Sequence, residues 1–451
     1  MPVTTHRQLT HTGGTTGEGP ASWGQFAIWE ALQRLRPADH AYNIRLDGPV
    51  EPAQPLDAVE RALSGLLEIH DALRTRLLPG PDGTLRQVLD GSGTTTLHLR
   101  ECSPRETAAT GEALAAELWR QSFDYAAQWP VRFGAVLAEG RVRHVVAVFS
   151  HTAIDAWGLP RIRADLAALA EGRSPAEIRT AARAVQPMEQ AAGQNSERGR
   201  RLDTAARRHW RATAVDAAVP DRPVPADAFA EGPRYRRAHL VSPALPGALA
   251  RICAAHGTTS ANVLLAAVSR ELAAWAGTGR CGLQLMVNNR FLPGHAQATG
   301  PLAMEGYFAV RTDPAEDFTA LLERTWRAAM TTYRSAYYDK RTLTADLAEF
   351  ADHPGVAFER SCWYNDQRTS TPADPAAGTG TAPRPSTLHW EDATDHGGGV
   401  AYALHAADVP GGAIEVAMTA DRRLLAAADI EQILHGVERT VLAAAAAAAG
   451  A

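Results

Sequence analysis

Apolar residues recur along the chain with two different periods, which predict helices in some segments and strands in others. Spacings of three and four residues are typical of amphipathic helices, and short β-branched runs bounded by Gly, Pro or polar residues are typical of strands. The predicted helices cover residues 22–35, 56–70, 106–121, 157–170, 261–276, 318–336 and 427–445. The predicted strands cover residues 42–46, 85–89, 94–99, 131–138, 145–149, 283–287, 307–311, 401–406 and 413–419.

These elements fall into two comparable halves. At 451 residues the chain exceeds the size at which a single hydrophobic core normally stops growing, so two lobes are expected. Mixed helices and strands in both halves predict an α/β (α+β) fold. The expected organisation is a disordered Thr- and Gly-rich lead-in at 1–20, a first lobe at 21–185, a helical surface segment and linker at 186–233, and a second lobe at 234–451. Residues 368–385 are expected to be an unstructured insertion.

The strongest candidate for chemistry follows the predicted strand Val145–Phe149. Ser150, His151 and Asp155 come directly after it. A buried strand fixes the backbone while the following loop stays accessible, which favours His151 as an acid or base. A Ser150–His151 nucleophilic dyad is disfavoured, because neighbours on an extended segment project to opposite faces. The simplest alternative is that His151 is a hydrogen-bonded core residue.

Composition narrows the class of protein. Hydrophobic residues make up 45% and charged residues 21%, which predicts a soluble globular protein. A net charge of −5 gives no basis for nucleic-acid binding. The four cysteines form no CxxC motif, so reduced thiols and a cytoplasmic location are expected, and no metal-ligand cluster is singled out. No segment is apolar enough to span a bilayer, and the alanine-rich tail at 441–451 is expected to fray.

The segment around His151 resembles the core motif of the condensation domains of nonribosomal peptide synthetases, within the chloramphenicol-acetyltransferase-like superfamily. That motif is two histidines, three variable residues, Asp and Gly. Here His151 is the second histidine and Asp155 the aspartate, while Ser150 replaces the first histidine and Ala156 replaces the glycine.

Further segments resemble the family's other motifs, in the family's order. They are Ser22–Trp29, His70–Thr75, Phe123-Asp124 with Pro130–Arg132, Thr258–Leu272, Val287–Arg290, Gly300–Arg311 and Cys362–Asn365. Their order over residues 20–440 is more specific than any single motif.

This resemblance implies two chloramphenicol-acetyltransferase-like lobes in a V with a central tunnel. It implies that a carrier protein presents an acyl group as a phosphopantetheine thioester and that an amine, or less often a hydroxyl, attacks it. No bound cofactor is expected beyond that donor tether. Because no adenylation segment or carrier-protein serine motif is recognisable, we expect a free-standing condensation enzyme of natural-product biosynthesis that acts on a carrier protein in trans.

The resemblance also implies roles for particular residues. His151 would be the base or positioner of the amine. Asp155 would be structural and paired with an arginine, with Arg290 the leading partner and Arg74 the second. The simpler interpretation of both arginines is that each forms an ordinary ion pair.

Substrate contacts are implied at two further places. Asn365 would orient substrate, or would simply cap the end of its strand. Backbone groups of Ala156, Trp157 and Gly158 would line the oxyanion position.

Three departures from the family pattern leave alternatives open. Ser150 and Ile69 replace a histidine and an arginine, and Ala156 would be strained if its backbone needed a positive φ. One alternative is therefore a catalytically inactive, condensation-like scaffold that binds carrier proteins or tailoring enzymes. A coenzyme A-dependent acyltransferase of the same superfamily is the third.

Overall fold

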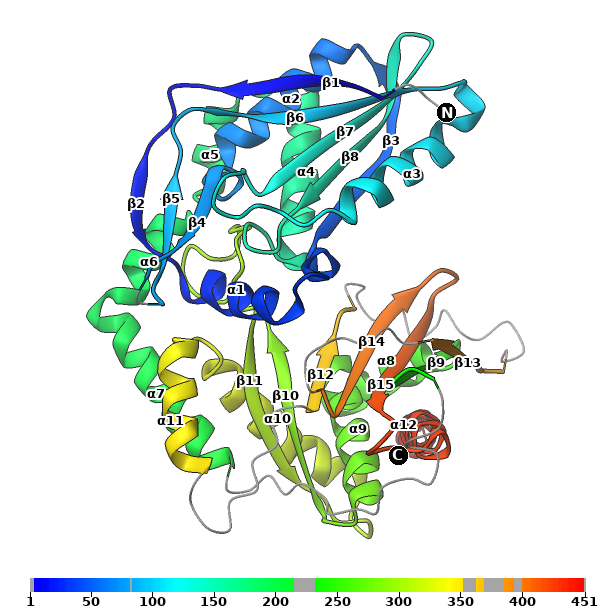
Figure 1. Ribbon diagram of the computed structural model, residues 1–451. Helices are drawn as coiled ribbons and strands as arrows, with labels where there is room; N and C mark the ends of the chain where they lie inside the picture. The colour runs from blue at the N-terminus through cyan, green and yellow to red at the C-terminus, as the bar shows by residue number, and fades with distance from the viewer. Residues whose placement is uncertain are drawn as a thin grey trace. The chain divides into compact units, whose positions relative to one another are not determined.

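A computed structural model of the chain describes residues 4–81, 83–214, 232–351, 362–368, 385–392 and 400–449. Helices and strands alternate along it (Figure 1), which confirms the predicted mixed α/β fold. The chain forms two compact units. Unit 1 contains residues 1–201 and 288–304, and unit 2 contains residues 202–287 and 305–451.

Unit 1 is built on a five-stranded sheet with the order β1-β6-β7-β8-β3. The strands are β1 (Thr4–His11), β6 (Gly93–Glu101), β7 (Val131–Ala138), β8 (Arg141–Phe149) and β3 (Ile44–Gln54). The β6–β7 pair is parallel and the other pairs are antiparallel. Glu139 and Gly140 join β7 to β8 with φ values of 55° and 71°, the conformation that a two-residue hairpin turn requires.

Helices cover both faces of this sheet, because apolar residues occupy both faces of its central strands. Phe133 on β7 packs with α2 (Leu56–Ile69) and α4 (Leu159–Ala170) in one core cluster. Val136, on the opposite face of β7, packs with α3 (Thr107–Trp119) in a second cluster. The strand that delivers His151 is therefore held between two layers of helices.

A second, three-stranded sheet in unit 1 has the order β2-β5-β4, formed by β2 (Gly17–Pro20), β5 (Leu85–Leu89) and β4 (Thr75–Pro79). Helix α1 (Trp23–Leu35) follows β2, and Ser22 caps it by accepting a hydrogen bond from the Gln25 amide at 3.2 Å. Two further helices of unit 1 are α5 (Pro175–Ala182) and α6 (Pro187–Asn195), and α7 (Glu197–Ala214) continues from unit 1 into unit 2. Short 3₁₀ helices are η1 (Asp39–Tyr42), η2 (Asp71–Arg74), η3 (Pro104–Glu106) and η4 (Ala156–Gly158).

Unit 2 is built on a seven-stranded sheet with the order β11-β10-β12-β14-β15-β9-β13. Its strands are β11 (Met304–Arg311), β10 (Arg280–Val287), β12 (Cys362–Asp366), β14 (Tyr402–Val409), β15 (Ala413–Asp421), β9 (Tyr235–Ser242) and β13 (Thr387–Asp392). β12 pairs in parallel with β10 and β14, whereas β14, β15, β9 and β13 pair in antiparallel fashion.

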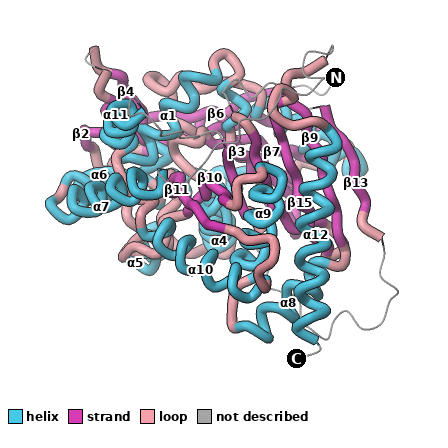
Figure 2. Tube along the Cα trace, turned by 90° about the horizontal axis from the view of Figure 1, so that it is seen from below, coloured by secondary structure: helices cyan, strands magenta, loops and turns pink. Residues whose placement is uncertain are grey.

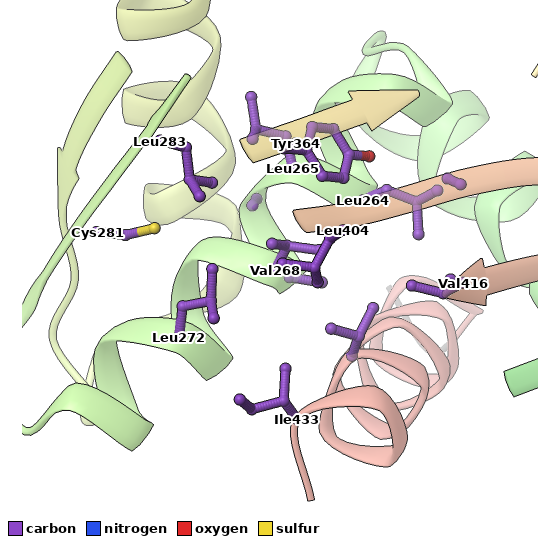
Figure 3. Packing of buried hydrophobic residues seen from close by; sticks show 14 of the residues in the cluster. Leu264, Leu265, Val268, Leu272, Cys281, Leu283, Tyr364, Leu404, Val416 and Ile433 are labelled. Carbon is purple, nitrogen blue, oxygen red and sulfur yellow. The ribbon is translucent and has the colours of Figure 1, made fainter. Parts of the chain in front are cut away.

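The core of unit 2 lies between one face of this sheet and the helices α8 (Leu245–His256), α9 (Ser260–Ala276) and α12 (Ala427–Ala449). Figure 3 shows Leu264 and Val268 of α9 packed with Leu404 of β14. Helices α10 (Phe318–Arg334) and α11 (Lys340–Ala351) complete the unit. In the described part of the chain no single helix is long and apolar enough to cross a bilayer. Helices α8 and α9 together have the length and composition of a membrane span, but they are bent by 105° relative to each other.

The structure corrects several boundaries. Most of residues 1–20 is ordered, because β1 pairs with β6 and β2 pairs with β5. Residues 288–304 cluster with unit 1 instead of with the second lobe. The tail expected to fray is helical to Ala449 and packed at least to Ala445, since Val441 and Ala445 are fully buried. Residues 215–231 and 369–384 of the expected linker and insertion lie outside the described residues. The V and its tunnel stay predictions.

Candidate active site

His151 follows β8 by two residues, in a turn that Ser150 shapes. Ser150 is buried, and its amide donates to the carbonyl of Pro130 at 3.0 Å. Its hydroxyl lies 2.8 Å from the Thr152 hydroxyl and accepts a hydrogen bond from the Thr152 amide at 3.2 Å. Ser150 therefore acts on the backbone of the turn, and its hydroxyl is engaged with Thr152.

The His151 side chain is half-buried, and its surroundings favour the neutral imidazole. Burial lowers its pKa below the usual 6.5, and the nearby Asp155 carboxylate only partly opposes this effect. Nδ1 is buried and makes no well-formed hydrogen bond to any described residue. The Tyr42 ring lies beside the imidazole, with the ring centroids 5.9 Å apart. A neutral imidazole whose ring is not tied to a carboxylate can accept a proton at neutral pH.

Asp155 is the centre of a buried network that fixes this turn. Arg290 donates to its carboxylate from both terminal nitrogens, at 2.9 Å from Nη1 and 2.6 Å from Nη2. The amides of Gly158, Leu302 and Ala303 donate to the same carboxylate at 3.0, 3.1 and 3.2 Å. The predicted pairing with Arg290 is therefore present. With five donors around it, the Asp155 carboxylate holds the backbone of the turn in place.

The segment 288–304 reaches Asp155 because its own turns are fixed. Asn289 adopts a φ of 55°, and its side-chain amide donates to the Leu302 carbonyl at 2.9 Å. The Asp155 amide donates to Thr299 at 3.3 Å. A Cβ atom at Gly158 would lie 2.6 Å from the Thr299 carbonyl oxygen, so this close approach requires glycine.

Arg74 does not contact Asp155, so its place as second-choice partner was wrong. It is fully buried and donates to Asp71 at 2.8 Å, to the Leu67 carbonyl at 2.8 Å and to the Asp90 carbonyl. Arg179 donates to the same Asp71 carboxylate at 2.7 and 2.9 Å. Arg74 therefore belongs to a separate ion-pair cluster that connects η2 to its neighbours.

The segment Ala156–Gly158 differs from two expectations. The Gly158 amide is engaged with the Asp155 carbonyl at 2.9 Å and its carboxylate at 3.0 Å, so it cannot line an oxyanion position. Ala156 is exposed in η4 and has a negative φ, so its Cβ causes no strain. Trp157 is half-buried, and its contact with substrate stays a prediction, as does that of Ala156.

Asn365 lies in unit 2, near the end of β12. Its Oδ1 atom is buried without a hydrogen-bond partner among the described residues, which argues against a simple strand-end cap. In the strand register it lies opposite His405 of β14. Asn365 and His151 belong to different units, so a shared role in one site stays a prediction.

The sequence analysis missed two contributions to this site. Tyr42 was placed in a strand, but it ends the 3₁₀ helix η1 and lies against His151. The amides of Leu302 and Ala303 were missed because backbone donors leave no side-chain signal. The available signal in the sequence was the Gly300-Pro301 motif directly before them.

Comparison with known proteins shows the family to which this chain belongs. The family model described as "Condensation domain" matches residues 17–450. This chain belongs to the condensation-domain family. It is 28% identical over 320 residues to the phosphinothricin tripeptide synthetase PhsC of Streptomyces viridochromogenes, covering 68% of this chain. The match spans 29% of PhsC, less than a third of that protein.

Solved structures confirm the condensation-domain fold. One is described as the molecular basis for condensation domain-mediated chain release from the enacyloxin polyketide synthase. It has a TM-score of 0.72 and 21% identity, over 94% of this chain and 82% of that chain. Another is a complex of the X-domain and OxyB from teicoplanin biosynthesis, with a TM-score of 0.66 and 18% identity, over 95% of this chain and 93% of that chain.

Proposed function

We propose that this chain joins an acyl group, carried as a thioester on the phosphopantetheine arm of a carrier protein, to an amine, with His151 as base or positioner. The observation that carries this proposal is a half-buried imidazole of lowered pKa on a turn locked by Asp155 and Arg290. Membership of the condensation-domain family supports the reaction class.

The reaction requires the protein to align the amine with the thioester and to supply one proton acceptor. The amine nitrogen attacks the thioester carbonyl, so a C–N bond forms and the C–S bond breaks. The proton that the amine loses passes to the neutral His151 imidazole and leaves with the thiolate as the free thiol. General-base catalysis of this kind contributes about 10²–10⁴-fold. A hydroxyl acceptor would give an ester by the same steps, and we propose the amide as the main product.

One specific observation favours a second candidate, a catalytically inactive scaffold. Ser150 replaces the first histidine of the motif, and its hydroxyl is engaged with Thr152. The fold is also similar to an X-domain solved in complex with OxyB. In this alternative the surface of the domain recruits carrier proteins or tailoring enzymes, and His151 has no chemical role.

The test is single-turnover aminolysis of an acyl-loaded carrier protein, added in trans, with a panel of amines. We expect product from the parent protein and about 10²–10⁴-fold less from His151→Ala. The matched control is His98→Ala, which removes a half-buried histidine of β6. Equal turnover by His151→Ala would remove this residue from the mechanism. Carrier binding without turnover by the parent would favour the scaffold. Faster turnover of the matching coenzyme A thioester would indicate a coenzyme A-dependent acyltransferase.

A further inference from the structure

A cluster of two histidines and two glutamates lies on one face of the unit 2 sheet. His239 lies on β9, His389 and Glu391 lie on the edge strand β13, and Glu415 lies on β15. The neighbouring residues Ala238 and Leu240 point into the helix-covered core, so His239 points to the opposite face. Figure 2 shows β13, β9 and β15 side by side.

The strand register brings these side chains together from distant parts of the sequence. His389 lies directly opposite His239, and the two rings are stacked with their centroids 4.7 Å apart and their planes within 4°. Ligand atoms of His239, His389 and Glu415 all lie within 4.8 Å of one another. We expected no metal ligands from the sequence, because residues 239, 389 and 415 share no spacing motif.

The two ring nitrogens of His239 have different partners. Nε2 lies 2.9 Å from Glu391 Oε2 in a hydrogen bond. Nδ1 lies 3.1 Å from Glu415 Oε1 but is not aligned for a hydrogen bond, although this side chain is only 10% exposed. When Nε2–H donates to Glu391, the lone pair of Nδ1 and a carboxylate oxygen lie side by side. Two acceptors this close repel each other unless a proton or a metal cation is bound between them.

We propose that this cluster binds a divalent transition-metal cation of the Zn²⁺ type. Nδ1 of His239, a ring nitrogen of His389 and a carboxylate oxygen of Glu415 would supply three ligands, leaving the fourth position to water or another ligand. Two imidazoles and one carboxylate suit zinc and disfavour Mg²⁺ or Ca²⁺, which prefer oxygen. Glu391 would orient His239 from its far side, as carboxylates commonly do behind metal-bound histidines.

Cation binding needs only a local adjustment. Ligands about 2.0–2.1 Å from a tetrahedral zinc lie about 3.3 Å from each other, close to the present separation of Nδ1 and the Glu415 oxygen. His389 must turn its ring toward them, and its exposed position on an edge strand allows this. The bound cation would connect β13 to β9 and β15. All four residues belong to unit 2, so this proposal does not depend on the proposed function.

The test is titration of chelator-treated protein with Zn²⁺ by calorimetry and with Co²⁺ by visible absorption. We expect one ion per chain, a tetrahedral-type Co²⁺ spectrum that Zn²⁺ abolishes, and a raised Tm with Zn²⁺ but not with Mg²⁺. His389→Ala and Glu415→Gln should each lose the Co²⁺ spectrum. Glu391→Gln, which removes only the orienting carboxylate, should weaken Zn²⁺ binding by about 10–100-fold.

The chain offers a matched control in unit 1. His6 and His98 also lie opposite each other on paired strands, with ring centroids 4.8 Å apart, but they meet edge-to-face at 88°. His98→Ala should leave the Co²⁺ spectrum unchanged. Zn²⁺ binding that survives His389→Ala and Glu415→Gln would overturn the proposal. So would parent protein that binds no Zn²⁺ at micromolar concentrations, because a proton alone would then resolve the contact between His239 and Glu415.

Discussion

Two histidines of unit 1, His70 and His151, lie near buried carboxylates but are held in different ways. His70 is 2% exposed, and its Nε2 lies 2.9 Å from Asp165, which also accepts from Arg161 at 2.7 Å. His151 makes no such bond, because Asp155 binds Arg290 and backbone amides instead. One carboxylate fixes a ring, and the other fixes the loop that carries a ring.

This difference separates a structural histidine from a candidate catalytic one. Burial lowers the pKa of both rings, so a lowered pKa alone does not distinguish them. What distinguishes them is exposure together with the ring partner. A carboxylate bound to one ring nitrogen does not stop the other nitrogen from taking a proton, but the His70 ring is almost fully enclosed, whereas the His151 ring is half-buried. His70 is therefore a hydrogen-bonded core residue, which is the simplest alternative that was considered for His151.

The largest expected effect comes from removing the carboxylate that fixes the loop. Asp155→Ala leaves the Arg290 guanidinium, whose side chain is 11% exposed, without its buried counter-ion. We expect the free energy of unfolding to fall by about 3–5 kcal/mol, measured by urea denaturation. The matched control is Asp57→Ala, which removes an exposed helical pair with Arg61 and should leave the free energy of unfolding close to that of the parent. Similar costs for the two variants would contradict the structural role of Asp155.

The next largest effect is expected from removing each of the two imidazole rings. His70→Ala removes a fully packed side chain and its bond to Asp165, and should lower the free energy of unfolding by about 2–4 kcal/mol. His151→Ala should cost about 1 kcal/mol or less, because its ring is half-buried and its Nδ1 makes no well-formed hydrogen bond to a described residue. Urea denaturation of both variants measures the contrast. A larger cost at His151 than at His70 would reverse the assignment of roles.

A smaller effect, to which both imidazole rings contribute, is expected in the pH dependence of stability. Both rings stay neutral in the folded protein, whereas in the unfolded chain they take up protons below about pH 6.5. Stability should therefore be full above that pH and fall as the pH drops below it, by up to about 1.4 kcal/mol per pH unit for each ring. Urea denaturation between about pH 7 and pH 5 should show a shallower slope for His151→Gln than for the parent. An unchanged slope would mean that the His151 ring is not buried enough to resist protonation.

The fold was predictable where apolar periodicity was strong and local. The helix at 56–70 and the strand at 131–138 were predicted within a residue of α2 and β7. The polar strand β1, Thr4–His11, was not predicted, because its order comes from pairing with β6 far along the chain. Edge strand β13, with its exposed Trp390 and Glu391, was missed for the same reason.

Of the groups that form the site, only side chains could be predicted from the sequence. The His151 motif and the Asp155–Arg290 pair were found through a family resemblance, since no local pattern connects residues 135 positions apart. The amides of Leu302 and Ala303 could not be found, because any residue other than proline supplies the same donor. Strain at Ala156 was expected only if its backbone needed a positive φ, and the backbone here does not adopt one.

The smallest expected effect comes from testing whether the backbone at residue 156 needs glycine. Ala156→Gly restores the residue of the family motif at an exposed position of η4, where φ is negative. If the backbone needed glycine, the substitution would relieve strain and stabilise the protein. Because Ala156 already fits, the substitution only adds freedom to the unfolded chain, and should lower the free energy of unfolding by about 0.4–1 kcal/mol. Urea denaturation of both proteins measures the sign. A gain in stability would show that the alanine strains the loop that carries His151.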